Sequence, residues 1–130
     1  MNASPTPLMQ AYILLAEAAQ EGFDWDTAFE AARKVDEELG EVREELQKID
    51  TPLRQQALEE EIGDLFLACV CLARHCKVNP EKAISLGLKK FKKRYERLRS
   101  FAQEKGVSLQ DAPSDELSLW WKELKGKTLA

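Results

Sequence analysis

Four acidic residues fall into two pairs whose spacing corresponds to one turn of a helix. Glu38 and Glu41 form the first pair, and Glu61 and Asp64 form the second, with nineteen residues between them. Side chains three residues apart leave one face of a helix, so each pair should flank the apolar stripe of its own helix. Four carboxylates at packed faces repel one another unless a multivalent cation neutralises them. All-oxygen ligation favours a hard ion, so the sequence predicts a Mg²⁺ site in which Mn²⁺ could substitute.

The same acids allow a simpler interpretation. The first pair lies in the segment DEELGEVREEL, residues 36–46, and glutamate-rich helices commonly present a solvated, charged face. The spacing by itself does not decide between a solvated face and a metal site.

A basic segment, residues 89–99, follows the acids and contains seven lysines and arginines. Lys90 and Arg94 are four residues apart and flank the apolar positions Phe91 and Tyr95, as the acids flank theirs. A lysine supplies a point charge and an arginine a bidentate fork, which together suit a phosphate chain beside the carboxylates. The alternative for the whole segment is a solubilising face or a weak nucleic-acid patch.

Cysteine and histidine offer little further chemistry. Cys71 and His75 are four residues apart and could bind zinc together with the neighbouring Cys76, but no further ligand is evident. We therefore interpret these cysteines as core or surface thiols. The chain has three cysteines and no basic segment at its start that would indicate a secretory signal, so we expect reduced thiols and a cytoplasmic location.

The elements that must position these residues all have helical periodicity. Thr6-Pro7 predicts the start of a first helix and Gly22 its end. Further helices are expected over about 25–49, 52–75, 80–105 and 115–125. The short connections predict an all-α fold, an antiparallel bundle of four main helices plus a short C-terminal helix. We expect a single domain over 1–130, with its core at about 8–125.

One part of the third helix is hydrophobic on every side. This run, Leu65 to Ala73, is too short to span a bilayer, and a helix that is apolar all round must be covered all round. The sequence therefore predicts a homodimer or homotetramer with this run at its centre. The net charge of −4 argues against a general nucleic-acid binder, and we expect neither nucleic acid nor membrane as a partner.

Together with their surroundings, the acids resemble a known family, the MazG-type nucleoside triphosphate pyrophosphohydrolases of the all-α NTP pyrophosphatase superfamily. The family pattern, Glu-x-x-Glu and then Glu-x-x-Asp, reads here Glu38-Leu-Gly-Glu41 and Glu61-Ile-Gly-Asp64. Similar blocks surround it: GFDW (22–25), KVDEELGEVREEL (34–46), EEEIGDLFLACVCLAR (59–74) and NPEKAI…KKFKKRYE (79–96). The resemblance covers roughly residues 10 to 125 and is to the catalytic C-terminal domain of two-domain MazG proteins, here standing alone.

The resemblance implies hydrolysis of an NTP or dNTP between the α and β phosphates, giving NMP and pyrophosphate with Mg²⁺ required, in nucleotide-pool house-cleaning. It implies these site residues: metal-binding Glu38, Glu41, Glu61 and Asp64 with supporting Glu37 and Glu60, phosphate-binding Lys90 and Arg94, and Trp121 and Lys125 covering the nucleotide. Either Glu38 or Glu41 could orient the attacking water.

Three alternatives stay open. Trp120 and Trp121 could both belong to an apolar stripe with Leu117 and Leu124, which would make them core residues. The substrate could be that of a sister specificity, phosphoribosyl-ATP or dUTP. The chain could also be a catalytically idle helical dimerisation module.

Overall fold

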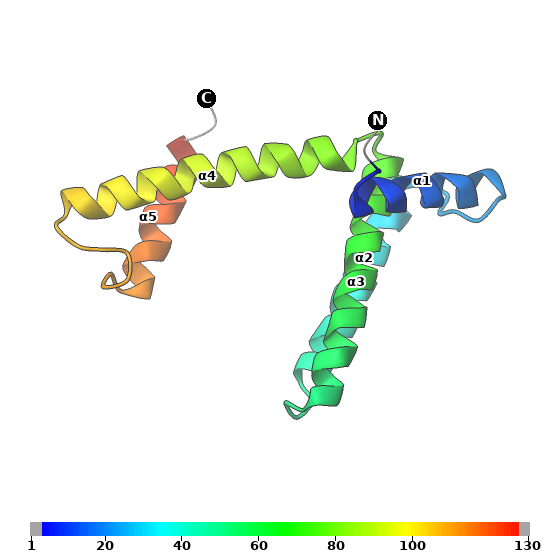
Figure 1. The fold of residues 1–130 in the computed structure, drawn as a ribbon, viewed down its shortest axis with the longest axis horizontal. Coiled ribbons are helices and arrows are strands. Elements are labelled where there is room, and N and C mark those ends of the chain that lie inside the picture. Colours follow the sequence, from blue (N-terminus) through cyan, green and yellow to red (C-terminus); the bar gives the residue numbers. More distant parts are fainter. Residues whose placement is uncertain (1–3, 128–130) are drawn as a thin grey trace. The chain divides into compact units, whose positions relative to one another are not determined.

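The computed structural model describes residues 4–127 and is all-helical, as predicted (Figure 1). Its helices are α1 (Pro7–Gln20), α2 (Ala28–Leu46), α3 (Pro52–His75), α4 (Pro80–Glu104) and α5 (Ser114–Lys127). No strand occurs among the described residues. The chain divides into two compact units, whose boundary in the sequence falls between Ala83 and Ile84, and each unit is described by itself.

The first three helices begin in the same way, at a threonine. The side-chain oxygens of Thr6, Thr27 and Thr51 accept hydrogen bonds from backbone N–H groups three residues further on, at 3.3, 3.1 and 3.2 Å. Such an N-cap pairs donors that the first helical turn leaves without partners, and it stabilises a helix by about 1 kcal/mol. Proline in the first turn of α1 and α3 adds a preset backbone angle.

Glycine and asparagine mark other helix ends that the sequence predicted. Gly22 and Gly106 follow α1 and α4 with φ angles of 91° and 74°, in the left-handed region that favours glycine. Before Pro80, the side-chain oxygen of Asn79 accepts a hydrogen bond from the backbone N–H of Glu81 at 2.9 Å. These ends are therefore determined by local chemistry.

The second helix is shorter at both ends than the predicted segment 25–49. Before its start, the backbone N–H of Asp26 donates to Oε2 of Glu30 at 3.1 Å, so Asp26 belongs to the cap and not to the helix. Beyond its end, Nη1 of Arg54 in α3 donates to the carbonyl oxygen of Lys48 at 2.9 Å. Both interactions use side chains to satisfy backbone groups outside the helix, which periodicity alone does not reveal.

The first unit is a helical hairpin with a third helix against it. The two helices α2 and α3 are joined by the short segment 47–51 and pack along each other in opposite directions, and α1 packs against α3 (Figure 1). The buried side chains between these helices are mostly small or branched: Ala31, Val42, Leu58, Ala68, Val70 and Cys71. Small side chains allow the helix axes to approach closely, and this fixes which residues of α2 face which residues of α3.

The apolar run Leu65 to Ala73 is only partly covered within its own unit. Ala68 and Val70 are buried, whereas Phe66 is 62% exposed and Leu67 is 47% exposed. Homo-oligomerisation therefore stays a prediction. None of the described helices combines the length and the apolar character that a membrane crossing needs.

The second unit contains α5 and the part of α4 from Ile84 onward. A buried cluster of Leu98, Ala102, Ala112 and Trp120 joins the end of α4 to α5. Phe101 packs edge-on against the Trp120 ring, with 5.3 Å between the centroids. This cluster holds α5 against α4 and so determines where the second tryptophan, Trp121, is presented.

Candidate metal and nucleotide site

The α2–α3 hairpin brings three of the four predicted metal-binding acids together. One carboxylate oxygen from each of Glu38, Glu61 and Asp64 lies within 4.8 Å of the other two. The Glu38 side chain is only 13% exposed, while Asp64 lies at the exposed margin. Oxygen ligands at this separation from two helices are a suitable donor set for a hard divalent cation.

The fourth acid, Glu41, lies outside this group of three but close enough to act on it. The pKa of the Glu61 carboxyl is raised above its usual value, first because burial removes water and then because Asp64, Glu41 and Glu38 repel its charge. The repulsion by these three neighbours reflects an excess of negative charge around Glu61. Such an excess fits a site that takes up a divalent cation.

A lysine of α2 partly offsets the negative charge of these acids. Nζ of Lys34 lies 3.0 Å from Oε1 of Glu38 and 3.6 Å from Oε2 of Glu37. These contacts, led by the hydrogen bond to Glu38, raise the pKa of the Lys34 ammonium. The pair with Lys34 was not predicted from the sequence, although its spacing of four residues from Glu38 is the signal of such a pair. Glu60, the other supporting acid, is exposed and lies outside the group of three.

The four predicted substrate-binding residues all belong to the second unit. Arg94 is half-buried and its guanidinium carbon lies 6.0 Å from the centroid of the Trp121 ring. The Trp121 ring also packs against Phe91, with 5.4 Å between the centroids. Lys90 and Lys125 are exposed. The structure thus brings Arg94 and Trp121 together at one aromatic surface.

The two adjacent tryptophans have different environments. Trp120 is 9% exposed and belongs to the buried cluster, whereas Trp121 is partly buried and packs at the edge of that cluster. The core interpretation therefore holds for Trp120. A partly accessible indole beside an arginine is a suitable surface for a planar base.

The fold and the acids define a class: an all-helical protein with a carboxylate-lined site on paired helices. Residues 27–98 match the MazG nucleotide pyrophosphohydrolase domain. The chain belongs to this family. The matched segment contains all four acids of the two pairs together with Lys90 and Arg94, and it ends before Trp121 and Lys125.

Curated relatives agree with this assignment. The chain is 32% identical over 126 residues to the nucleoside triphosphate pyrophosphohydrolase/pyrophosphatase MazG of Thermotoga maritima. The matched region covers 97% of this chain and 47% of that protein. It is 32% identical over 118 residues to the nucleoside triphosphate pyrophosphohydrolase of Escherichia coli K12, covering 91% of this chain and 44% of the relative. The chain therefore spans about half the length of these relatives.

Proposed function

We propose that this chain hydrolyses a nucleoside triphosphate, NTP or dNTP, between its α and β phosphates, giving NMP and pyrophosphate in a Mg²⁺-dependent reaction. One observation carries the proposal. Within the segment that matches the family, three carboxylates from Glu38, Glu61 and Asp64 have oxygens within 4.8 Å of one another. The relatives are named nucleoside triphosphate pyrophosphohydrolases, which supports the coarser part of this proposal.

In this proposal Glu38, Glu61 and Asp64 hold the divalent ion, with Mn²⁺ as a substitute for Mg²⁺. The donor set supports this choice, because it is all oxygen and carries more negative charge than Lys34 offsets. The bound ion would neutralise phosphate oxygens and lower the pKa of a water molecule. Glu37 and Glu60 act as supporting acids.

Glu41 is the acid that we assign to the attacking water. Glu38 already pairs with Lys34 and belongs to the group of three, whereas Glu41 lies next to that group but outside it. Glu41 would orient the water and accept its proton as the oxygen bonds to the α phosphorus. The bond from that phosphorus to the bridging oxygen breaks, and pyrophosphate leaves with the electron pair.

Lys90 and Arg94 would bind the pyrophosphate as it leaves, and Trp121 and Lys125 would cover the nucleotide. The contact of Arg94 with Trp121 supports a shared role, because a guanidinium next to an indole can bind phosphate while the ring stacks on a base.

For the whole protein we propose a homodimer or homotetramer, since Phe66 and Leu67 expose apolar surface on α3. The free cysteines favour a reducing, cytoplasmic compartment.

The experiment is a substrate panel. The chain is incubated with NTPs, dNTPs, dUTP and phosphoribosyl-ATP in Mg²⁺, in water enriched in ¹⁸O, and the products are identified by mass spectrometry. We expect NMP and pyrophosphate, with the heavy oxygen in the NMP, because attack occurs at the α phosphorus. Glu61→Gln should lose about 100-fold or more of the turnover, since even outer partners of a metal site cost 10- to 100-fold.

Two results would contradict the proposal. Label in the pyrophosphate, or release of orthophosphate, would move the attack to another phosphorus. No turnover on any substrate, together with no Mg²⁺ binding by calorimetry, would favour the idle dimerisation module.

A further inference from the structure

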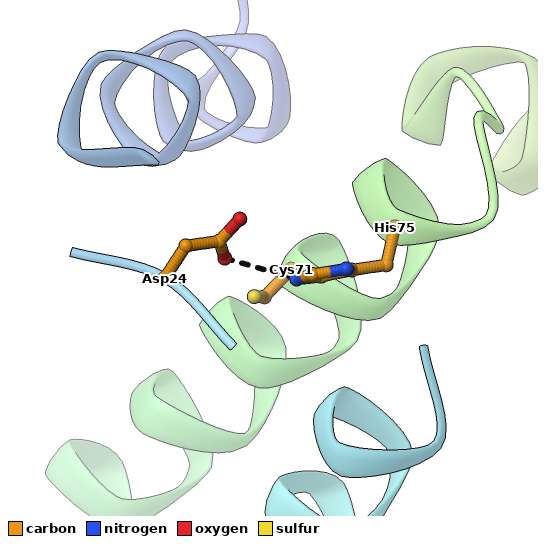
Figure 2. A group of neighbouring side chains, drawn as sticks. All are labelled: Asp24, Cys71 and His75. Carbon is orange, nitrogen blue, oxygen red and sulfur yellow. Dashed lines mark hydrogen bonds and ion pairs between the residues drawn. The ribbon is translucent and has the colours of Figure 1, made fainter. Parts of the chain in front are cut away.

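A second group of metal-binding side chains lies in the first unit, apart from the group of three acids. Asp24 belongs to the segment between α1 and α2, and Cys71 and His75 lie one turn apart on α3. Figure 2 shows the Asp24 carboxylate directed toward the face of α3 that carries the other two side chains. A carboxylate oxygen, the thiol sulfur and a ring nitrogen all lie within 4.8 Å of one another. Asp24, and not the neighbouring Cys76, completes this group of three.

Asp24 and His75 are held in place before any ligand binds. Nε2 of His75 lies 2.9 Å from Oδ1 of Asp24, and the same oxygen accepts the backbone N–H of Trp25 at 2.8 Å. Arg74 forms an ion pair with that oxygen as well. An arginine that binds a ligating carboxylate orients it as an outer partner of a metal site does, and its charge keeps the carboxylate ionised.

The surroundings are partly enclosed and have room for one more small ligand. Cys71 is buried, and only 10% of the His75 side chain is exposed. A cavity of about 130 Å³ adjoins Asp24 and Cys71, and its other walls are formed by Leu15, Ala18, Phe23 and Trp25. This volume exceeds what a water molecule needs, so a bound ion could keep an open fourth position on the cavity side.

The donor atoms decide between possible ligands. A thiol sulfur, an imidazole nitrogen and a carboxylate oxygen form a mixed set that suits a borderline transition metal and not Mg²⁺.

We propose that Asp24, Cys71 and His75 form a binding site for a divalent transition metal of the Zn²⁺ type, separate from the group of three acids. Binding releases the Cys71 thiol proton to solvent. The imidazole proton of His75 moves to the ring nitrogen that faces away from Asp24, so that the other nitrogen can ligate. The ion would join the segment before α2 to the end of α3, and the fourth position would face the cavity.

Co²⁺ is the probe that separates the two sites, because a thiolate ligand gives a near-ultraviolet sulfur-to-metal charge-transfer band and an all-oxygen site gives none. With its cysteines reduced, the wild-type chain should develop this band at one Co²⁺ per chain, and Zn²⁺ should abolish it. Glu61→Gln should retain the band, since that substitution affects only the group of three acids.

Matched cysteine variants complete the test. Cys71→Ser should lose the band, whereas Cys69→Ser and Cys76→Ser, at exposed thiols, should keep it. Asp24→Asn, at a partly exposed loop position, should weaken Co²⁺ binding at least tenfold while circular dichroism stays helical. No band in the wild type, a band that survives Cys71→Ser, or unchanged affinity in Asp24→Asn would overturn the proposal. In that case the cluster is only an ion pair that holds the segment before α2.

Discussion

Nζ of Lys34 lies 3.0 Å from Oε1 of Glu38, one turn further along α2. Among the described residues, Glu38 is therefore the acid of the group of three that forms an ion pair. Glu61 has the opposite environment, because burial and neighbouring carboxylates both raise its pKa. Glu38 and Glu61 therefore contribute differently to the free energy of unfolding of the chain before a cation binds.

Neutralising Glu61 should stabilise the metal-free chain more than neutralising Glu38. Glu61→Gln relieves repulsion and breaks no described ion pair, so the melting temperature without Mg²⁺ should rise. Glu38→Gln relieves some repulsion but also removes the Lys34 pair, which is worth about 0.3–0.5 kcal/mol on a helix surface. Thermal unfolding followed by circular dichroism, with and without Mg²⁺, measures both effects.

Mg²⁺ supplies the control for this comparison. It should raise the melting temperature of the wild type and have much less effect on either variant, because each lacks one anionic ligand. Equal melting temperatures for all three proteins, with the same response to Mg²⁺, would contradict the assignment of these acids.

Phe66 should control assembly. Its side chain is 62% exposed on the apolar run of α3, so Phe66→Lys should move the chain toward monomer while the helices remain. Val70 is a poorer choice although it lies in the same run, because it is 3% exposed and its substitution would disrupt the unit itself. Leu119→Lys on α5, where Leu119 is 61% exposed, is the matched control and should leave the assembly unchanged. Light scattering at micromolar concentration measures the mass, and an active wild-type monomer would exclude this arrangement.

The sequence predicted well what depends on neighbours along the chain. Three helices begin where a capping residue precedes a proline, because cap chemistry is local: at Thr6-Pro7, Thr51-Pro52 and Asn79-Pro80. The predicted segment 25–49 extends beyond both ends of α2 (Ala28–Leu46). There the backbone is satisfied by side chains such as that of Arg54, which comes from the next helix.

For the candidate site, too, the sequence predicted local features but not the contacts between helices. Spacing revealed that Glu38 and Glu61 belong to helix faces, but it did not reveal which acids would come together. The packing of α2 on α3 decides this, and it leaves Glu41 outside the group of three. An apolar run likewise does not tell which of its residues face the chain's own core. Asp24 was missed as a neighbour of His75 because only the folded chain brings them together.

Trp120 and Trp121 should respond differently to substitution. Trp120→Ala empties part of the buried cluster, so local opening of α5 should become easier by about 3–5 kcal/mol. Trp121→Ala removes the tilted ring contact with Phe91 and should cost about 1 kcal/mol. Hydrogen exchange of the α5 amides measures both. If Trp121 covers the nucleotide, its variant should raise KM while α5 stays protected. An unchanged KM would restrict Trp121 to packing.

Lys90 and Arg94 test whether the basic face of α4 binds phosphate at particular residues. Replacing either residue by methionine keeps an unbranched side chain and removes the charge. Loss of one charge-assisted phosphate contact is worth about 1.5–3 kcal/mol, so kcat/KM should fall roughly ten- to a hundredfold. Arg94→Met should also cost stability of about 0.5–1 kcal/mol, because the guanidinium lies against the Trp121 ring.

Lys92→Met and Lys93→Met are the matched controls, since these lysines are exposed like Lys90 and lie on the same helix. Each control removes the same charge, so it lowers the general attraction of a polyanion equally. We expect kcat/KM to change less than about threefold in both controls, with the difference from Lys90→Met persisting at high salt, where long-range attraction is screened. Equal losses in Lys90→Met and both controls, all disappearing at high salt, would mean that α4 acts through its overall charge. The specific phosphate contact of Lys90 would then be wrong, while a persistent loss in Arg94→Met alone would leave Arg94 as the phosphate ligand.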